Sequence, residues 1–169
     1  AVDIYGAGEQ LAVGSVGSMG CSRAGNFAVQ NSDLLIVLGS RLSSITTGTD
    51  FCKFARAAKT VVVDIDHNEH SKDSIRIDHF IGVDLKLFLR SLHQKVDFLT
   101  DAWWIEKCLH WKLRFASIEP LFASQDLVDL YQLASTLSKS LPSDCSLVTD
   151  SGPIEVILPT NIHFRNKQR

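Results

Sequence analysis

Glycine recurs at every third position of the segment GSVGSMG, which spans residues 14–20. Glycine can turn the backbone sharply and leaves its N–H groups open to a ligand, so a loop of this kind can cradle a phosphate group. A helix that begins near Ser22 would point the positive end of its dipole at such an anion. The spacing is not the G-x-G-x-x-G of dinucleotide-binding folds, and no G-K-[ST] follows it. The loop alone therefore leaves two interpretations open, a phosphate cradle and a plain tight turn.

Charged side chains follow two apolar runs of the sequence. Arg41 comes just after residues 33–39, where its guanidinium could bind a diphosphate or form a surface salt bridge. Asp64 lies near the end of residues 60–66, where its carboxylate could accept hydrogen bonds from the hydroxyls of a ribose. We expect Asp64 to contact a ligand, and both roles stay open for Arg41.

Other polar residues have plainer interpretations. Asp66 is followed three residues later by Glu69, which fits a helix cap, and Asp84 could likewise cap a helix that follows it. His67 and His70 have no further histidine and no cysteine near them in the sequence, so we expect them to be solvated and not to bind a metal. The four cysteines are scattered without a C-x-x-C pair, at Cys21, Cys52, Cys108 and Cys145. We therefore expect reduced and mostly buried thiols, no metal site and no catalytic residue.

The order of apolar runs predicts how these residues are positioned. Strands are expected at residues 33–39, 60–66 and 79–84, and the first two have the length and continuous apolar character of parallel strands buried on both faces. Helical segments are expected at residues 23–31, 51–59 and 85–92. This alternation predicts an α/β fold with a Rossmann-like, doubly wound parallel sheet. Because such sheets bind ligands at the carboxyl ends of their strands, Arg41, Asp64 and Asp84 should lie near one another.

The character of the chain changes beyond residue 95. One helix is predicted from the spacing of Trp104, Cys108, Trp111 and Phe115, and a second from that of Leu127, Leu130, Tyr131, Ala134 and Leu137. Pro120 would separate them and Ser124 would cap the second. The aromatic stripe of the first helix is expected to be core. A strand should begin at residues 146–152 and lead into a frayed, basic tail.

Composition narrows the class of protein. The 169 residues are 45% hydrophobic and 21% charged with a formal net charge of −2, which is typical of a globular domain and gives no electrostatic reason to bind nucleic acid or an anionic membrane. No apolar run approaches the ~18 residues of a membrane span. The first residues show neither a basic leader nor an apolar signal core, which favours the cytoplasm, and the absence of an initiator Met suggests that the chain begins inside a longer protein.

Several motifs in order carry a family resemblance. The string VGSVGSMGCSRAGNFAVQNSDLLIVLGSRLSSITTGTDFCKFARAAKTVVVDID resembles the central domain of thiamine-diphosphate-dependent enzymes, closest to the acetolactate synthase-like group. The resemblance runs from about residue 11 to residue 92 and includes Arg23 and Asn26, the pair Thr47 and Gly48, and the downstream Asp84. The string LPSDCSLVTDSG resembles the beginning of the last domain of the family, which holds the diphosphate of the cofactor.

The resemblance implies an internal fragment of a three-domain enzyme. In the family, the first domain supplies a glutamate that activates the thiazolium, and the last carries a Gly-Asp-Gly…Asn motif for Mg²⁺ and diphosphate; neither is present here. We therefore expect residues 1–96 to be a partial central domain, 97–142 a helical linker, and 143–169 the first strand of the thiamine-diphosphate-binding domain with a divergent tail. The parent would be a transferase or lyase that decarboxylates a 2-keto acid and joins the product to an acceptor. It would use thiamine diphosphate and magnesium and form a homo-oligomer, whereas this chain alone would be catalytically silent.

The resemblance also implies a nucleotide site, because the central domain holds FAD in acetolactate synthase-like members, ADP in some relatives and nothing in others. The residues that match the nucleotide-binding motifs are Gly17, Ser18 and Met19 along the nucleotide, Gly39 and Arg41 at the diphosphate and ribityl region, Asp64 and Ile65 at the adenosine, and Asp84 at the adenine. Ile45 stands where flavin-binding relatives often have a second arginine, a loss of about 1.5–3 kcal/mol of charge-assisted bonding. A smaller nucleotide, or a structural and oligomerisation domain with no ligand, therefore stays open.

Overall fold

The structure is a computed structural model that describes residues 4–95, 101–115, 118, 127–165 and 167–169. The chain forms two compact units. We call Ala28–Ala102 the sheet unit, and Ala1–Phe27 together with Trp103–Arg169 the helical unit.

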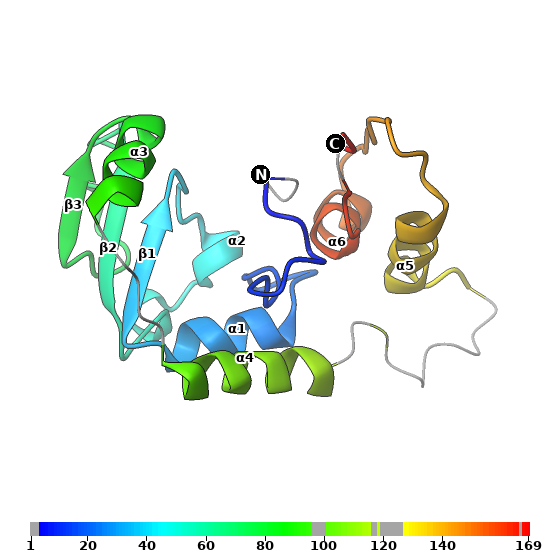
Figure 1. The fold of residues 1–169 in the computed structure, drawn as a ribbon, viewed down its shortest axis with the longest axis horizontal. Coiled ribbons are helices and arrows are strands. Elements are labelled where there is room, and N and C mark those ends of the chain that lie inside the picture. Colours follow the sequence, from blue (N-terminus) through cyan, green and yellow to red (C-terminus); the bar gives the residue numbers. More distant parts are fainter. Residues whose placement is uncertain (1–3, 96–100, 116–117, 119–126, 166) are drawn as a thin grey trace. The chain divides into compact units, whose positions relative to one another are not determined.

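The sheet unit contains three parallel strands (Figure 1). They are β1 (Leu34–Leu38), β2 (Lys59–Asp64) and β3 (His79–Gly82), in the spatial order β1-β2-β3. Leu34 pairs with Lys59 in the first ladder, and Val61 pairs with His79 in the second. The runs rich in valine, isoleucine and leucine favour strands, and the parallel pairing confirms the predicted α/β, Rossmann-like class in an incomplete sheet.

Parallel strands need crossover connections, and these are short here. The helix α2 (Ser44–Thr47) and the 3₁₀ helix η1 (Phe51–Lys53) connect β1 to β2, so the helical turns predicted at 51–59 are limited to η1. After β3 comes α3 (Leu85–Lys95), which packs against β2. The Asp84 carboxylate accepts hydrogen bonds from the backbone N–H groups of Lys86 and Leu87 at 2.9 and 3.2 Å, which confirms the predicted cap.

The core of the sheet unit is centred on β2. Val62 and Val63 point to opposite faces and are both 0% exposed, so β2 is covered on both sides. A core cluster joins Val62 to Val37 of β1 and to residues of the loops, Leu42 and Ile75. The prediction that the first strand is buried on both faces is wrong for β1, where Leu34, Ile36 and Leu38 are 50%, 38% and 41% exposed. They alternate with Val37 and share the face that no described element covers fully.

Aromatic packing organises one part of the helical unit. Helix α1 (Arg23–Asn31) begins where predicted, and the Ser22 hydroxyl accepts a bond from the Gly25 N–H at 3.3 Å. The ring of Phe27 lies 5.8 Å from Trp111 and 4.9 Å from Phe115, both of which belong to or directly follow α4 (Ala102–Arg114). The predicted aromatic stripe therefore packs as core.

The C-terminal helices pack on each other. Helix α5 (Leu130–Ser140) is capped by Asp129, whose carboxylate accepts from the Gln132 N–H at 2.8 Å. The predicted cap, Ser124, lies outside the described residues. Helix α6 (Pro153–Asn161) begins with a proline, which suits the first helical position, and packs against α5 through a buried cluster: Ala134, Leu158, Ile162 and Phe164.

The strand predicted at 146–152 is wrong. These residues form no strand, Val148 is 89% exposed, and the neighbouring Cys145 makes only an isolated bridge to Gln168. The tail predicted to be frayed is also ordered, since Gln168 is 3% exposed and its amide donates to the carbonyl oxygens of Leu141 and Pro142 at 3.2 and 2.7 Å. A short apolar run becomes a strand only when a partner strand satisfies its backbone. Here the Leu147 N–H donates to the Arg169 carbonyl at 2.6 Å and the Arg169 N–H donates to the Cys145 carbonyl at 3.0 Å, which makes a single bridge and not a ladder.

The cysteines are unpaired thiols, as expected, but only Cys108 is buried and Cys52 is exposed. Burial raises the pKa of the Cys108 thiol and, against a hydrogen bond with Ser15, that of Cys21. Within the described residues, no helix has both the length and the apolar character that crossing a bilayer requires.

Candidate functional site

The glycine loop belongs to the helical unit, where its own neighbours hold it. The Gly17 N–H donates to the Asn26 side-chain oxygen at 3.0 Å, and the Asn26 amide donates back to the Gly17 carbonyl at 2.8 Å. Gly17 is buried between these two bonds. The Gly17 N–H that would face a phosphate is therefore already paired with Asn26.

Close packing explains other glycines of this region. A Cβ atom at Gly25 of α1 would lie 2.4 Å from the Ser15 carbonyl oxygen, so the loop approaches the helix at a distance that only glycine allows. Gly20 has a φ of +66°, and its carbonyl accepts bonds from the Thr160 hydroxyl and the Asn161 amide of α6 at 2.8 and 2.5 Å. In this structure the loop packs on two helices, α1 and α6.

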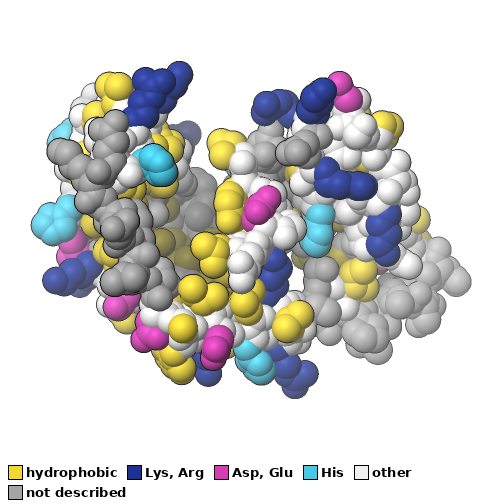
Figure 2. All heavy atoms as spheres, viewed as in Figure 1, with side chains coloured by type: hydrophobic (Ala, Val, Ile, Leu, Met, Phe, Trp, Pro, Cys, Tyr) yellow, Lys and Arg dark blue, Asp and Glu magenta, His cyan; other side chains and the backbone are white. Residues whose placement is uncertain are grey.

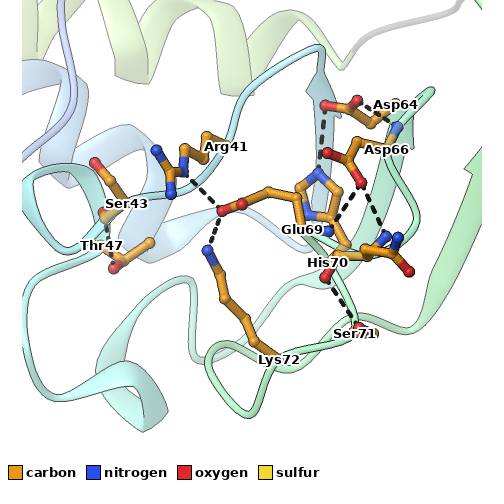
Figure 3. A network of polar contacts seen from close by, with 10 residues as sticks. Arg41, Ser43, Thr47, Asp64, Asp66, Glu69, His70, Ser71 and Lys72 are labelled. Carbon is orange, nitrogen blue, oxygen red and sulfur yellow. Dashed lines mark hydrogen bonds and ion pairs between the residues drawn. The ribbon is translucent and has the colours of Figure 1, made fainter.

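The residues at the strand ends form a polar network in the sheet unit (Figure 3). Gly39, with a φ of +57°, turns the chain after β1, and its N–H donates to the Val63 carbonyl at 2.9 Å. Leu42 has a φ of +53°, which is strained for leucine, and its buried side chain anchors the loop in the core. Between these two anchors, Arg41 projects outward with 74% of its side chain exposed.

Arg41 forms an ion pair with Glu69. Its Nε donates to Glu69 Oε1 at 2.8 Å, and Lys72 donates to the same carboxylate oxygen. The hydrogen bond from Lys72, followed by that from Arg41, lowers the pKa of Glu69 below its ordinary value. Of the two roles left open for Arg41, the structure contains the surface salt bridge.

Asp64, at the end of β2, also has internal partners. Its Oδ1 accepts from the Asp66 N–H at 3.0 Å, and its Oδ2 lies 3.3 Å from His70 Nε2. The bond from the Asp66 backbone is the largest cause that lowers the pKa of Asp64; burial opposes it, and the neighbouring His70 adds to it. The expectation that His70 is solvated is wrong: its side chain is 4% exposed, because the turn folds its ring to 5.6 Å from Phe80.

Asp66 caps the next turn, as predicted. Its Oδ1 accepts from the N–H groups of Asn68 and Glu69 at 3.0 and 3.1 Å, although the segment is a turn and not a helix. Asp64 and Asp66 together therefore fix the backbone that carries Glu69 and His70. Ile65, between them, is 75% exposed.

The structure thus divides the eight predicted binding residues between the units. Gly17, Ser18 and Met19 lie in the helical unit, and the other five lie in the sheet unit: Gly39, Arg41, Asp64, Ile65 and Asp84. Glu69, His70 and Lys72 were missed as site residues. The spacing of Glu69 and Lys72, three residues apart, was the available signal. Among the described residues, no group of three metal-ligating side chains comes together.

A separate cavity of about 1020 Å³ lies in the helical unit. Residues of the N-terminal segment, α5 and the C-terminal tail line it, and several of these are basic: Lys139, Arg165, Lys167 and Arg169. None of the eight predicted binding residues is among its lining residues. Arg165 is already engaged there, since its guanidinium donates to the Ser138 carbonyl at the end of α5 at 2.7 Å.

Comparison with known proteins defines the class. The family described as thiamine pyrophosphate enzyme, central domain, matches residues 1–92, more than half of the chain, and the chain belongs to this family. The resemblance noted from the sequence is thereby confirmed. The parallel sheet of the sheet unit fits this assignment.

The names of three relatives are more specific than the description of the family. A probable acetolactate synthase large subunit of Methanococcus aeolicus is 37% identical over 91 residues, which cover 54% of this chain and 15% of the relative. The corresponding protein of Methanocaldococcus jannaschii is 44% identical over 82 residues, 48% of this chain and 13% of the relative. Acetolactate synthase isozyme 2 large subunit of Escherichia coli K12 is 33% identical over 141 residues, 83% of this chain and 24% of the relative. The matched part thus makes up less than a quarter of each of these relatives.

The clasp on the glycine loop predicts the effect of Asn26→Ala. Loss of both hydrogen bonds leaves the buried N–H and carbonyl of Gly17 without partners, so the free energy of unfolding should fall by about 1 to 3 kcal/mol. Urea denaturation followed by circular dichroism measures this, and amide hydrogen exchange should accelerate in the loop. Asn68→Ala, at an exposed asparagine of the sheet unit, is the control; equal losses in both variants would contradict the prediction.

The lowered pKa of Asp64 predicts a pH dependence of stability. A carboxylate whose pKa is lower in the folded state stabilises the protein above its unfolded pKa, and this contribution is lost as the pH falls through the folded value. Asp64→Asn should therefore reduce stability at neutral pH and flatten the loss of stability between about pH 5 and pH 2. Thermal unfolding across this range tests it, and parallel curves for the two proteins would show that Asp64 is not responsible.

Proposed function

We propose that the chain is the central part of a larger thiamine-diphosphate-dependent enzyme of the acetolactate synthase type. The match of residues 1–92 to the central-domain family carries this proposal, and the names of the relatives support it. The parent would decarboxylate a 2-keto acid such as pyruvate and transfer the resulting carbanion equivalent, with thiamine diphosphate supplying the bond chemistry. No Gly-Asp-Gly motif for Mg²⁺ and diphosphate occurs in the sequence, so other parts of the parent would hold that cofactor.

The division of the chain is part of the same proposal. Residues 1–96 would be a partial central domain, 97–142 a helical linker, and 143–169 the start of the domain that binds thiamine diphosphate. The last segment contains α6 in place of the expected strand. We further propose a cytoplasmic location and a homo-oligomeric parent.

Within the chain, we propose that the strand ends of the sheet unit bind the phosphates of a nucleotide. Arg41 supports this, because its guanidinium is 74% exposed on a loop that is anchored on either side. The Gly17 N–H is engaged by Asn26, so side-chain cations and not that loop amide would make the phosphate contacts. Ile45, which is 50% exposed, supplies no second guanidinium for the diphosphate of either ADP or FAD, so Arg41 would carry that contact.

A second candidate is a structural role through β1, an edge strand of the sheet. In a parallel ladder, backbone groups alternate between the two sides of a strand. Asp33 and Gly39, which flank β1, face β2 through backbone bonds to Lys59 and Val63. The groups of Leu34, Ile36 and Leu38 therefore point outward, and these are also the three whose side chains are exposed. Figure 2 shows hydrophobic side chains at the surface on the face of the molecule that it draws, without distinguishing individual strands. An uncharged apolar edge of this kind pairs readily with a second copy.

Ligand-induced stabilisation tests the nucleotide proposal. A ligand at a hundred times its dissociation constant should raise the free energy of unfolding by about 2.7 kcal/mol, so ADP or FAD at such a concentration should raise the melting temperature. Arg41→Ala should remove the effect of ADP, whereas Arg56→Ala, at another exposed arginine of the sheet unit, should retain it. No shift at millimolar nucleotide would reject the binding role.

Self-association tests the structural candidate. We expect light scattering after size-exclusion chromatography to give a mass above that of the monomer. Ile36→Lys should lower this mass because it places a charge on the open face of β1. Ile45→Lys, at an isoleucine that is 50% exposed on α2, is the matched control and should leave the mass unchanged. If the chain without substitutions is monomeric, or if both substitutions have equal effects, association through β1 is excluded.

A further inference from the structure

One carboxylate in the sheet unit is shared by two cations from different segments. Glu69 Oε1 accepts from Arg41, on the loop after β1, and from Lys72, three residues beyond Glu69 (Figure 3). Within the described part of the chain, Glu69 is the only carboxylate that pairs with either cation. Two positive groups that converge on one negative oxygen are also the arrangement that binds a phosphate.

The three side chains differ in their access to solvent. Arg41 is 74% exposed and Lys72 is 44% exposed, whereas Glu69 is 22% exposed. The cations are thus open to a ligand from solvent. Exposed ion pairs of this kind contribute little to stability, so a competing anion can separate them at small cost.

The backbone around Glu69 is held independently of its carboxylate. Its N–H donates to the Asp66 carboxylate, and the Asp66 N–H is in turn bonded to Asp64 at the end of β2. The next residue, His70, is buried beside Asp64 and Phe80. A change of side-chain rotamer at Glu69 would therefore release both cations without unfolding the turn.

We infer that Arg41 and Lys72 form a binding site for a phosphate group, and that Glu69 occupies this site when no ligand is present. A phosphate carries more negative charge than a carboxylate and accepts both a forked guanidinium and a point-charge ammonium. The ligand is a phosphate of a nucleoside diphosphate, and Glu69 acts as a built-in competitor that weakens its binding. This inference rests on the proposed nucleotide site, to which it adds Lys72 as a binding residue and Glu69 as an inhibitory one.

The same unit offers a matched control pair. Lys53 Nζ lies 2.8 Å from Asp50 Oδ2, also at a spacing of three residues and also exposed, with no arginine sharing the carboxylate. Substitutions in the two pairs change the net charge equally. A difference between them therefore reports the local site and not the overall field of the protein.

Isothermal titration with inorganic pyrophosphate and with ADP tests the inference. Glu69→Gln should tighten binding of both by about threefold to tenfold, the range expected for releasing two exposed ion pairs, and Lys72→Gln should weaken both by a similar factor. Asp50→Asn and Lys53→Gln should each bind both ligands with the affinity of the chain without substitutions. Melting temperatures of all four variants check that they are folded.

The outcomes separate this inference from the proposed function. Suppose that ADP binds the chain without substitutions in an Arg41-dependent manner, and that Glu69→Gln and Lys72→Gln bind ADP with the same affinity. The inference is then overturned and the nucleotide site stands. Equal tightening in Glu69→Gln and Asp50→Asn would also overturn it, because net charge would then explain the effect. Binding by Glu69→Gln alone would support it. If neither the chain without substitutions nor any variant binds pyrophosphate or ADP, both proposals fail.

Discussion

The placement of β2 in the middle of the sheet is the constraint on which the rest of the sheet unit depends. This strand pairs with β1 on one side and β3 on the other, and Val62 and Val63 are fully buried on its two faces. Its carboxyl end is therefore anchored in the core. Asp64 is the last residue of β2, and through its bond to Asp66 it fixes the turn that carries Glu69 and His70. The core thus determines the geometry of the polar network.

The charged groups at the strand ends already have partners within the protein. Arg41 and Lys72 share Glu69, and Asp64 faces His70 and the Asp66 N–H. Such internal pairing keeps the network ordered without a ligand, but any anion that binds there must compete with a carboxylate. The affinity of the proposed phosphate site would then be set by the difference between two similar interactions, and not by the strength of either one.

Bonds and close contacts inside the helical unit hold the glycine loop. In the helical unit, Gly17 is bonded to Asn26, and Gly25 leaves the space that the Ser15 carbonyl occupies. The close approach of the Ser15 carbonyl thus accounts for the glycine at position 25 by packing.

The sequence by itself was enough to place the three strands, the aromatic core of α4 and the caps at Asp66 and Asp84, because each depends on local periodicity or on bonds within a few residues. Tertiary structure decided the burial of His70, the exposed face of β1, the helix α6 and the sharing of Glu69 between two cations. Each of these depends on which distant segment covers a side chain or satisfies a backbone group. Spacing along the chain specifies neighbours on one element, but it does not specify the partner that arrives from another.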